Sequence, residues 1–488
     1  MSSAKEPVTR RFGNGLTVLI KEDKSHPVVS LQYWVGTGSM NEGHWQGGGL
    51  SHLLEHLVFK GTAHISGQEL ARKVQERGGH WNAYTSVNRT VYYIDGPAES
   101  WQIFLNLLTE LVFFPTFPED EMEREKEVVR REMAMYADDP DSVAYQLLMQ
   151  TLYLKHPRRW PVLGERAAFD CLTRQDVLDY HASRYVPNNV VLSIAGDVDA
   201  AEILSHLELL VEDLKSRPLN REPIPHEPHQ FGSRRVRKEF AVPYSKLHLA
   251  WRLPCSAHPD TPALSALSSI LGGGRSARFY EKFHDRLGLV YSIEVHSNQS
   301  ETDEGAFTIS MDVDRAQRDK VRDLVLQELR NLAEEDFTED LKRVCKQTRV
   351  SRLRRRSSAS GVASEMGADW FGSRNLNLSS EWQEAIERVT TEDLHRVCST
   401  WLSSPNVTEV SLDPPGSNAG DEERASASAG TALSEHVLGN GMKVVIREDH
   451  RLPLAYACMA FKAGCRAENE HDAGVTDLMK SDRSHVVL

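Results

Sequence analysis

An internal repeat is the feature of this sequence that most constrains how the chain is organised. The segment "GNGMKVVIREDHRLP" (439–453) repeats "GNGLTVLIKEDKSHP" (13–27) at an offset of 426 residues. A segment that recurs at a fixed offset indicates a recurring structural unit. We therefore expect a tandem protein, in which a first complete unit is followed by the truncated start of a second.

Two stretches rich in proline, glycine and polar residues divide the chain further. Such composition is typical of linkers, and 488 residues exceed what one core usually holds. The predicted parts are a first subdomain over 1–213, an interdomain linker over 214–233, a second subdomain over 234–413, a flexible linker over 414–433 and an incomplete repeat over 434–488.

Apolar residues recur with both strand and helix periods along the first unit. Strands are predicted over 16–23, 28–39 and 190–198, and helices over 66–79, 101–113 and 119–136. A second series begins with "SKLHLAWRLP" (245–254). Because strands and helices are mixed without regular alternation, the predicted fold class is α+β, with two related mixed α/β subdomains and an incomplete third α+β segment.

Composition excludes several classes of protein. The net charge of −13 argues against general nucleic-acid binding, which needs clustered lysine and arginine. No apolar run approaches the roughly 20 residues that cross a bilayer, and the start "MSSAKEPVTRRFGNG" lacks the apolar core of a secretory signal. The six cysteines have no CxxC spacing. We expect a cytoplasmic protein without nucleic-acid or membrane partners.

The segment "GGGLSHLLEHLVFKGT" (47–62) places two histidines and a glutamate within one helical turn. Because residues four apart share a helix face, His52 and His56 can direct ring nitrogens at one metal ion. Glu55 is adjacent in angle and can reach a water on that metal. Zinc held by two imidazoles and a carboxylate keeps an open position for such a water. The pattern is equally compatible with an amphipathic helix whose polar face carries three residues.

A third ligand is expected from the helix "EDEMEREKEVVRREMAMY" (119–136). Its apolar stripe is predicted at Met122, Val129, Met133 and Tyr136, and two glutamates seven residues apart, Glu125 and Glu132, fall within or beside that stripe. Buried carboxylates are costly unless they are paired or bound to a metal. Simple solvation explains most glutamates on so charged a helix, but for these two we expect a structural or catalytic role.

Several blocks of the sequence resemble one peptidase family. The motif His52-x-x-Glu55-His56, followed by Glu132 in "VVRREM", is similar to the inverted zinc motif of the pitrilysin and mitochondrial processing peptidase family, the inverzincins. The blocks "NAYTSVNRTVYY" and "EREKEVVRREM" resemble that family in the same order. The resemblance spans about residues 8 to 412 and starts again at 434.

The resemblance implies a role for each matching residue. His52, His56 and Glu132 would hold one Zn²⁺ per chain, Glu55 would be the general base, and Glu125 would support the site. The segment Asn82, Ala83 and Tyr84 would belong to an edge strand to which a substrate peptide adds. In the second subdomain, Tyr291 matches a substrate-binding tyrosine, and His284 stands where the family has an arginine.

The function implied is that of a zinc-dependent endopeptidase acting on peptides or unfolded segments. Residues 1 to about 412 would form one half of a clamshell metallopeptidase, closed by a homodimer partner or by the second tandem half. The alternative is a non-catalytic scaffold or assembly subunit of the same fold. In the second copy, Asp477, Lys480 and Ser481 replace the motif residues, so this copy is predicted to bind no metal.

Overall fold

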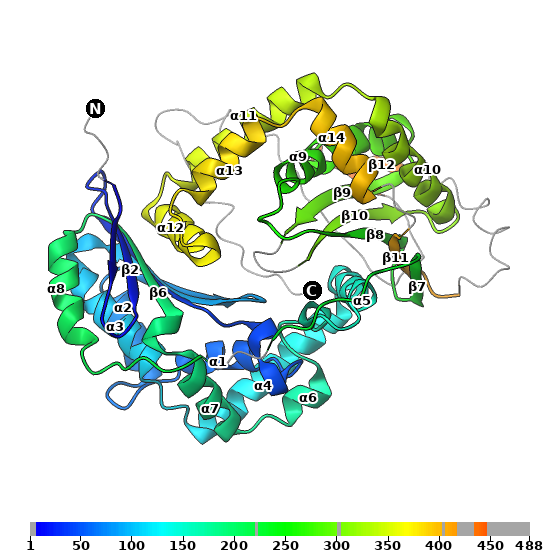
Figure 1. Ribbon diagram of the computed structural model, residues 1–488. Helices are drawn as coiled ribbons and strands as arrows, with labels where there is room; N and C mark the ends of the chain where they lie inside the picture. Colours follow the sequence, from blue (N-terminus) through cyan, green and yellow to red (C-terminus); the bar gives the residue numbers. More distant parts are fainter. Residues whose placement is uncertain (1–5, 220–222, 300–303, 403–405, 417–433, 447–488) are drawn as a thin grey trace. The chain divides into compact units, whose positions relative to one another are not determined.

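Two mixed β-sheets organise the larger of the two units into which the chain divides (Figure 1). The computed structural model describes residues 6–219, 223–299, 304–402, 406–416 and 434–446. The larger unit comprises residues 1–422, and the smaller comprises residues 423–488. Strands and helices are mixed in the larger unit, which confirms the predicted α+β class.

The first sheet has six strands in the order β1-β2-β6-β3-β5-β4. Only β2 and β6 run parallel, and the other neighbours are antiparallel. The strand β6 is buried throughout, as expected for a strand rich in β-branched residues that is covered on both faces. The strands are β1 (Val8–Arg11), β2 (Thr17–Glu22), β3 (Val28–Val35), β4 (His80–Thr85), β5 (Thr90–Pro97) and β6 (Val190–Gly196).

The second sheet has five strands in the order β7-β11-β8-β10-β9. Its connectivity and strand directions match those of β2-β6-β3-β5-β4, so the two subdomains are related in topology. The charged edge strand β7 did not stand out in the sequence, because "RRVRKE" carries one apolar residue. The strands are β7 (Arg234–Glu239), β8 (Ser245–Leu253), β9 (Val290–Asn298), β10 (Gly305–Val313) and β11 (Thr408–Asp413).

Each sheet packs one face against helices of its own subdomain. Buried side chains of α1, α2, α3, α7 and α8 form the first core, and those of α9, α10, α11, α13 and α14 form the second. The first-subdomain helices are α1 (Leu50–Val58), α2 (Gly67–Gln75), α3 (Trp101–Phe113), α4 (Glu119–Asp138), α5 (Pro140–Leu152), α6 (Arg166–Asp170), α7 (Arg174–Arg184) and α8 (Ala200–Leu210). Those of the second are α9 (Thr261–Gly272), α10 (Arg318–Asn331), α11 (Thr338–Arg355), α12 (Ala359–Ser373), α13 (Leu378–Glu387) and α14 (Thr391–Val397).

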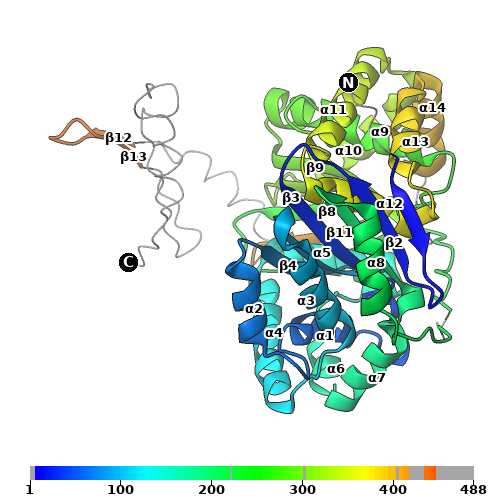
Figure 2. The ribbon, with the colours of Figure 1, turned by 90° about the vertical axis from the view of Figure 1, so that its left-hand side faces the viewer.

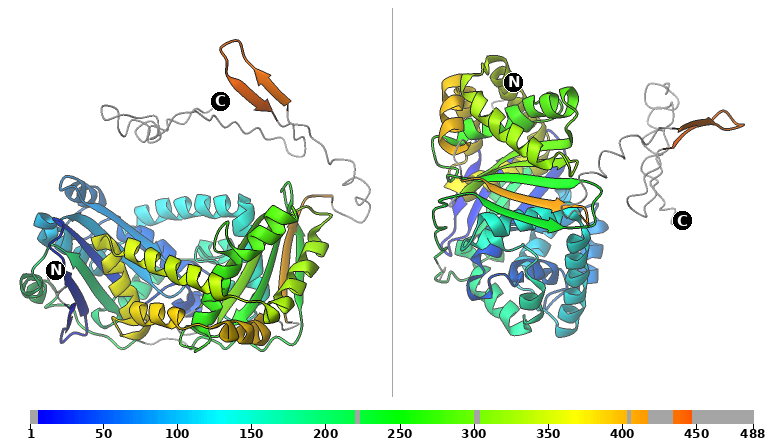
Figure 3. Two further views of the ribbon diagram at one scale, coloured as in Figure 1. Left: turned by 90° about the horizontal axis from the view of Figure 1, so that it is seen from above. Right: turned by 90° about the vertical axis from the view of Figure 1, so that its right-hand side faces the viewer.

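The subdomains exchange a helix to cover the remaining face of each sheet (Figures 2 and 3). The helix α12 packs on the first sheet through Val362 and Met366. Its Gly367 permits a close approach, since a Cβ there would lie 2.3 Å from the Trp34 ring. In return, α5 packs Leu148 against the second sheet. The apolar faces of both sheets are thus removed from water by segments far apart in sequence.

The smaller unit contains a hairpin that reproduces the start of the chain. The strands β12 (Ser434–Val437) and β13 (Lys443–Ile446) pair Ser434 with Ile446, whereas β1 and β2 pair Val8 with Ile20. Both registers are related by the offset of 426 residues found in the sequence. The agreement supports the proposed repeat.

Several predictions about the smaller unit and the chain's boundaries stay predictions. Residues 447–488, with Asp477, Lys480 and Ser481, lie outside the described residues, as does 417–433 of the predicted linker. No helix in the described part of the chain has the length and apolar character needed to cross a membrane.

Candidate metal centre

The helix α1 begins at a glycine-rich turn that brings it close to a neighbouring loop. Gly49 has φ +70°, and a Cβ there would lie 2.1 Å from the Leu163 carbonyl oxygen, so other residues are sterically excluded. Beyond the turn, the leucines of "LSHLLEHLV" are buried in the first core. The opposite face of the same helix carries His52, Glu55 and His56.

A buried glutamate anchors the N-terminus of α1. The backbone N–H of Ser51 donates to Glu42 Oε1 at 2.8 Å, where the positive end of the helix dipole favours a negative group. Burial raises the pKa of Glu42 to about 8. In the sequence, Glu42 was noticeable only as a match to Glu468 in the repeat.

The helix α4 supplies the third member of the site. Met122, Glu125 and Val129 are buried, as the predicted stripe requires, and Met133 is partly buried. The prediction that Tyr136 continues this stripe is wrong, because its side chain is 45% exposed. The physical reason is that the last turn of α4 extends beyond the core, so nothing covers its apolar residues.

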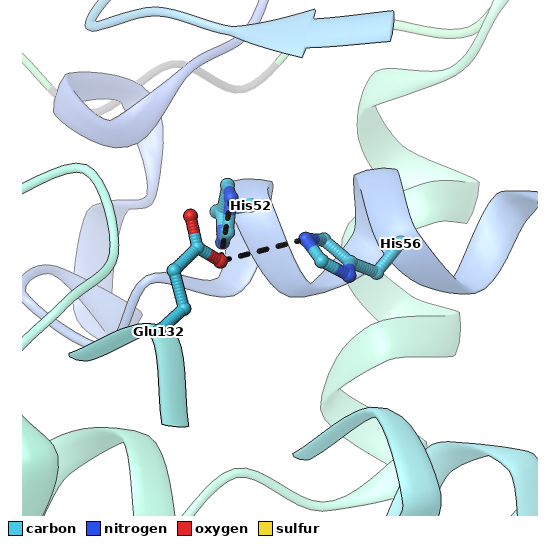
Figure 4. Close-up of side chains that lie close together, drawn as sticks. All are labelled: His52, His56 and Glu132. Atoms are coloured by element: carbon cyan, nitrogen blue, oxygen red, sulfur yellow. Dashed lines mark ion pairs between the residues drawn. The ribbon is translucent and has the colours of Figure 1, made fainter. Parts of the chain in front are cut away.

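The three predicted ligands lie together. Their ligating atoms all fall within 4.8 Å of one another. The Nε2 atoms of His52 and His56 each lie 3.8 Å from Glu132 Oε2, and both rings face that carboxylate (Figure 4). The described part of the second subdomain contributes no comparable group.

The electrostatics of these groups suit a bound cation. Burial lowers the pKa of His52 to about 3, and the neighbouring His56 lowers it further, so the ring is the neutral form that ligates metals. Its Nδ1 is buried without a hydrogen-bond partner among the described residues. Burial raises the pKa of Glu132. Two imidazoles and a carboxylate form a ligand set that zinc accepts, so the residues fit that ion.

Glu125 holds the second histidine in place. Its Oε2 lies 3.1 Å from His56 Nδ1, and its Oε1 pairs with Lys60 Nζ at 2.5 Å. Burial raises the pKa of Glu125, but the hydrogen bonds from His56 and Lys60 outweigh it and lower the pKa overall. An ionised Glu125 that accepts the Nδ1 proton leaves His56 Nε2 free to bind a metal.

Glu55 lies on the same face of α1 and is held by the edge strand. The hydroxyl of Thr85, the last residue of β4, donates to Glu55 Oε2. Burial raises the pKa of Glu55, and the hydrogen bond from Thr85 partly offsets this. Sequence reasoning missed Thr85 and Lys60. The alternation of β4 offered one signal, since Thr85 shares a strand face with Ala83.

The predicted substrate residues of the first subdomain lie on an edge strand. Asn82, Ala83 and Tyr84 belong to β4, which pairs with β5 on one side and has no strand partner on its other side among the described residues. Tyr84 is exposed and contacts the Trp34 ring edge to face. Such an edge offers backbone donors and acceptors to an extended peptide.

The two candidates of the second subdomain contact other groups there. Tyr291 is exposed on β9, and its hydroxyl donates to Asp314 at 2.9 Å. His284 stacks on Tyr280 and pairs with Asp285 at 2.7 Å. None of these contacts joins the metal centre.

The fold and the site define an α+β protein with a His–His–Glu group suited to a divalent metal. Residues 17–166 match the family described as Insulinase (Peptidase family M16), and residues 172–347 match the Peptidase M16 inactive domain. The chain belongs to peptidase family M16, which confirms the family resemblance of its motifs.

Relatives of this chain are named as zinc proteases. An uncharacterized zinc protease of Rickettsia felis is 27% identical over 406 residues, covering 81% of this chain and 94% of the relative. One of Mycobacterium tuberculosis is 30% identical, covering 60% of this chain and 67% of the relative. A solved protease structure from Helicobacter pylori has a TM-score of 0.77 and 26% identity, covering 84% of this chain and 100% of that structure.

Proposed function

We propose that this chain is a zinc metalloendopeptidase that hydrolyses peptide bonds in peptides or unfolded segments. The observation that carries the proposal is the convergence of ligating atoms from His52, His56 and Glu132 within 4.8 Å, beside the carboxylate of Glu55. The names of the relatives support a zinc protease. One zinc ion per chain is proposed, held by these three side chains.

Each residue of the site has a defined task in the proposed reaction. When bound, zinc supplies Lewis acidity, which polarises a carbonyl group and makes a water molecule acidic near neutral pH. Glu55 takes a proton from the attacking water and passes it to the leaving amine. The raised pKa of Glu55 makes its carboxylate a stronger base for that transfer. Glu125 and Lys60 keep His56 in the correct tautomer.

The edge of β4 is the proposed substrate platform. An extended peptide that pairs with Asn82–Tyr84 would add a seventh strand to the first sheet. The Thr85–Glu55 hydrogen bond links this strand to the general base, so a scissile bond bound along β4 would lie near Glu55. Tyr291 and His284 are proposed to contact substrate from the second subdomain.

A second half is the proposed partner. Two sources are compatible with the chain, a homodimer and the second tandem unit. The hairpin β12–β13 favours the tandem unit, because its register repeats that of β1–β2. The non-catalytic scaffold remains the alternative for the chain as a whole, and the following experiment separates the two.

Zinc should be required for cleavage. The wild-type chain, incubated with a quenched unfolded peptide, is expected to lose activity with a zinc chelator and to regain it with added zinc. His52→Ala should bind zinc roughly 100-fold more weakly or worse, because a ligand is lost. Metal analysis and peptide cleavage measure both effects. His64→Ala, an exposed histidine outside the site, is the control. Stoichiometric zinc without cleavage of any peptide would favour the scaffold.

Thr85→Val should lower kcat about tenfold with little change in KM, because Glu55 loses the hydroxyl that orients it. Steady-state kinetics on the quenched peptide measure the two constants separately. Thr85→Ser keeps the hydroxyl and should retain activity within about twofold. An equal loss in both variants would mean that the methyl group, rather than the hydrogen bond, matters.

A further inference from the structure

A cavity separate from the metal centre lies in the larger unit where β2 and β6 begin. Its volume is about 680 Å³, which is in the range of sites for drug-sized ligands. The end of β1, the loop after β3, residues 223–224 and the C-terminal end of α12 complete its walls. It shares no residue with the His–His–Glu group.

The charge of this cavity is positive. Two arginines, Arg11 from β1 and Arg374 from the end of α12, line it, and its described lining includes no aspartate or glutamate. Neither guanidinium forms an ion pair within the part of the chain that the structure describes. Desolvation lowers the pKa of Arg374, and the positive charge of Arg11 lowers it further. Two cations that repel one another would be stabilised by an anion that contacts both.

Arg374 occupies a backbone conformation that favours glycine. It ends α12 with φ +58°, and its N–H donates to the Trp370 carbonyl at 2.9 Å. A glycine at this helix end avoids a cost of about 1 kcal/mol that other residues incur. Only Phe117 shares a positive φ among the described non-glycine residues. The arginine side chain therefore occupies this position at the expense of stability, as is common for residues that bind ligands.

The remaining walls combine apolar and amide groups. Met40, Ile224, Trp370 and Phe371 supply apolar surface, and asparagines such as Asn41 supply neutral hydrogen-bonding groups. We propose that this cavity binds a carboxylate on an apolar body, with the carboxylate held by Arg11 and Arg374. Guanidinium groups suit this task because their planar N–H pairs match the two oxygens of a carboxylate.

Two sources can supply this chemistry, the C-terminal carboxylate of a peptide and a free small organic acid. The inference does not depend on peptidase activity, so a failure of one proposal leaves the other standing. Binding alone tests it.

The experiment measures binding of N-acetyl-L-phenylalanine and of its carboxamide by titration calorimetry. The full chain should bind the acid and bind the amide at least tenfold more weakly. Arg11→Gln and Arg374→Gly should each lose at least tenfold in affinity for the acid. Arg374→Gly should keep or raise the unfolding temperature, because the left-handed position then holds a glycine. Arg354→Gln, an exposed arginine of α11, is the matched control and should bind normally.

Two further arms decide where the ligand binds and which source it has. His52→Ala should leave binding unchanged. Loss of binding in His52→Ala but not in Arg374→Gly would place the acid at the metal centre and overturn the proposal, as would equal binding of acid and amide. The peptide N-acetyl-Ala-Ala-Phe is then compared with its amidated form. Tighter binding of the free-ended peptide than of the small acid supports a peptide terminus, and the reverse order supports a free acid.

Discussion

Glu55→Gln is expected to lower kcat for peptide cleavage by about 10³-fold while the chain still binds one zinc. The amide has nearly the shape of the carboxylate and can still accept the hydrogen bond from Thr85. It cannot accept a proton at neutral pH, so general base catalysis, which contributes about 10² to 10⁴, is lost. Steady-state kinetics on a quenched peptide and metal analysis of the same preparation measure the two effects.

The matched control for this variant is Glu123→Gln on α4. That glutamate is exposed and lies outside the site, so its activity should stay within about twofold of wild type. Retention of more than a tenth of wild-type activity in Glu55→Gln would exclude Glu55 as the general base. Loss of zinc in a folded Glu55→Gln chain would instead mean that this carboxylate helps to hold the metal.

Asp413→Asn should destabilise the larger unit by about 3 kcal/mol, because it removes the partner of a buried cation. Arg318 is fully buried on α10 and donates to Asp413 Oδ2 at the end of β11. Two hydroxyls, from Ser245 and Ser411, donate to Oδ1 at 2.6 and 2.7 Å. The effect should lie at the low end for buried pairs, since Arg318 keeps Asp319 as a second partner. Urea unfolding followed by tryptophan fluorescence measures it.

The effect of Asp413→Asn should depend on pH. Burial raises the pKa of Asp413, but hydrogen bonds from Ser245, Ser411 and Arg318 outweigh it and lower the pKa in the folded chain. The stabilisation is therefore complete above the unfolded pKa of about 3.9 and is lost as pH falls through the folded pKa. The difference in unfolding free energy should be constant from about pH 7 to pH 5 and should shrink below about pH 4.

A surface pair provides the comparison for this stability change. Asp323→Asn removes the same charge from an exposed carboxylate that pairs with Arg322. Exposed pairs contribute little, so its effect should stay within about 0.5 kcal/mol at every pH. A comparable loss in both variants would attribute the effect to net charge instead of the buried pair.

Local periodicity made much of the fold and part of the site predictable. His52 and His56 share a face of α1 because they are four residues apart, and Glu125 and Glu132 share a face of α4 because they are seven apart. The strands β2, β3 and β6 carry continuous buried runs that mark them in the sequence. Tyr136 shows the limit of this reasoning, because periodicity does not reveal where a helix leaves the core.

Contacts between distant segments were not predictable in the same way. Lys60 reaches Glu125 across 65 positions of the sequence, and Thr85 reaches Glu55 across 30. The exchange of α5 and α12 between the two sheets and the meeting of Arg11 with Arg374 in one cavity join still more distant residues. No pattern within a single helix or strand reports these pairings.

The sequence by itself determined which face of each helix carries chemistry, and that the opening hairpin recurs 426 residues later, because spacing along one element is a local property of the backbone. Only the tertiary structure decided which carboxylates are ionised, which hydroxyl orients Glu55 and where two unpaired arginines meet. Those outcomes depend on burial and on neighbours supplied by other elements, which arise only when the apolar faces of the sheets pack.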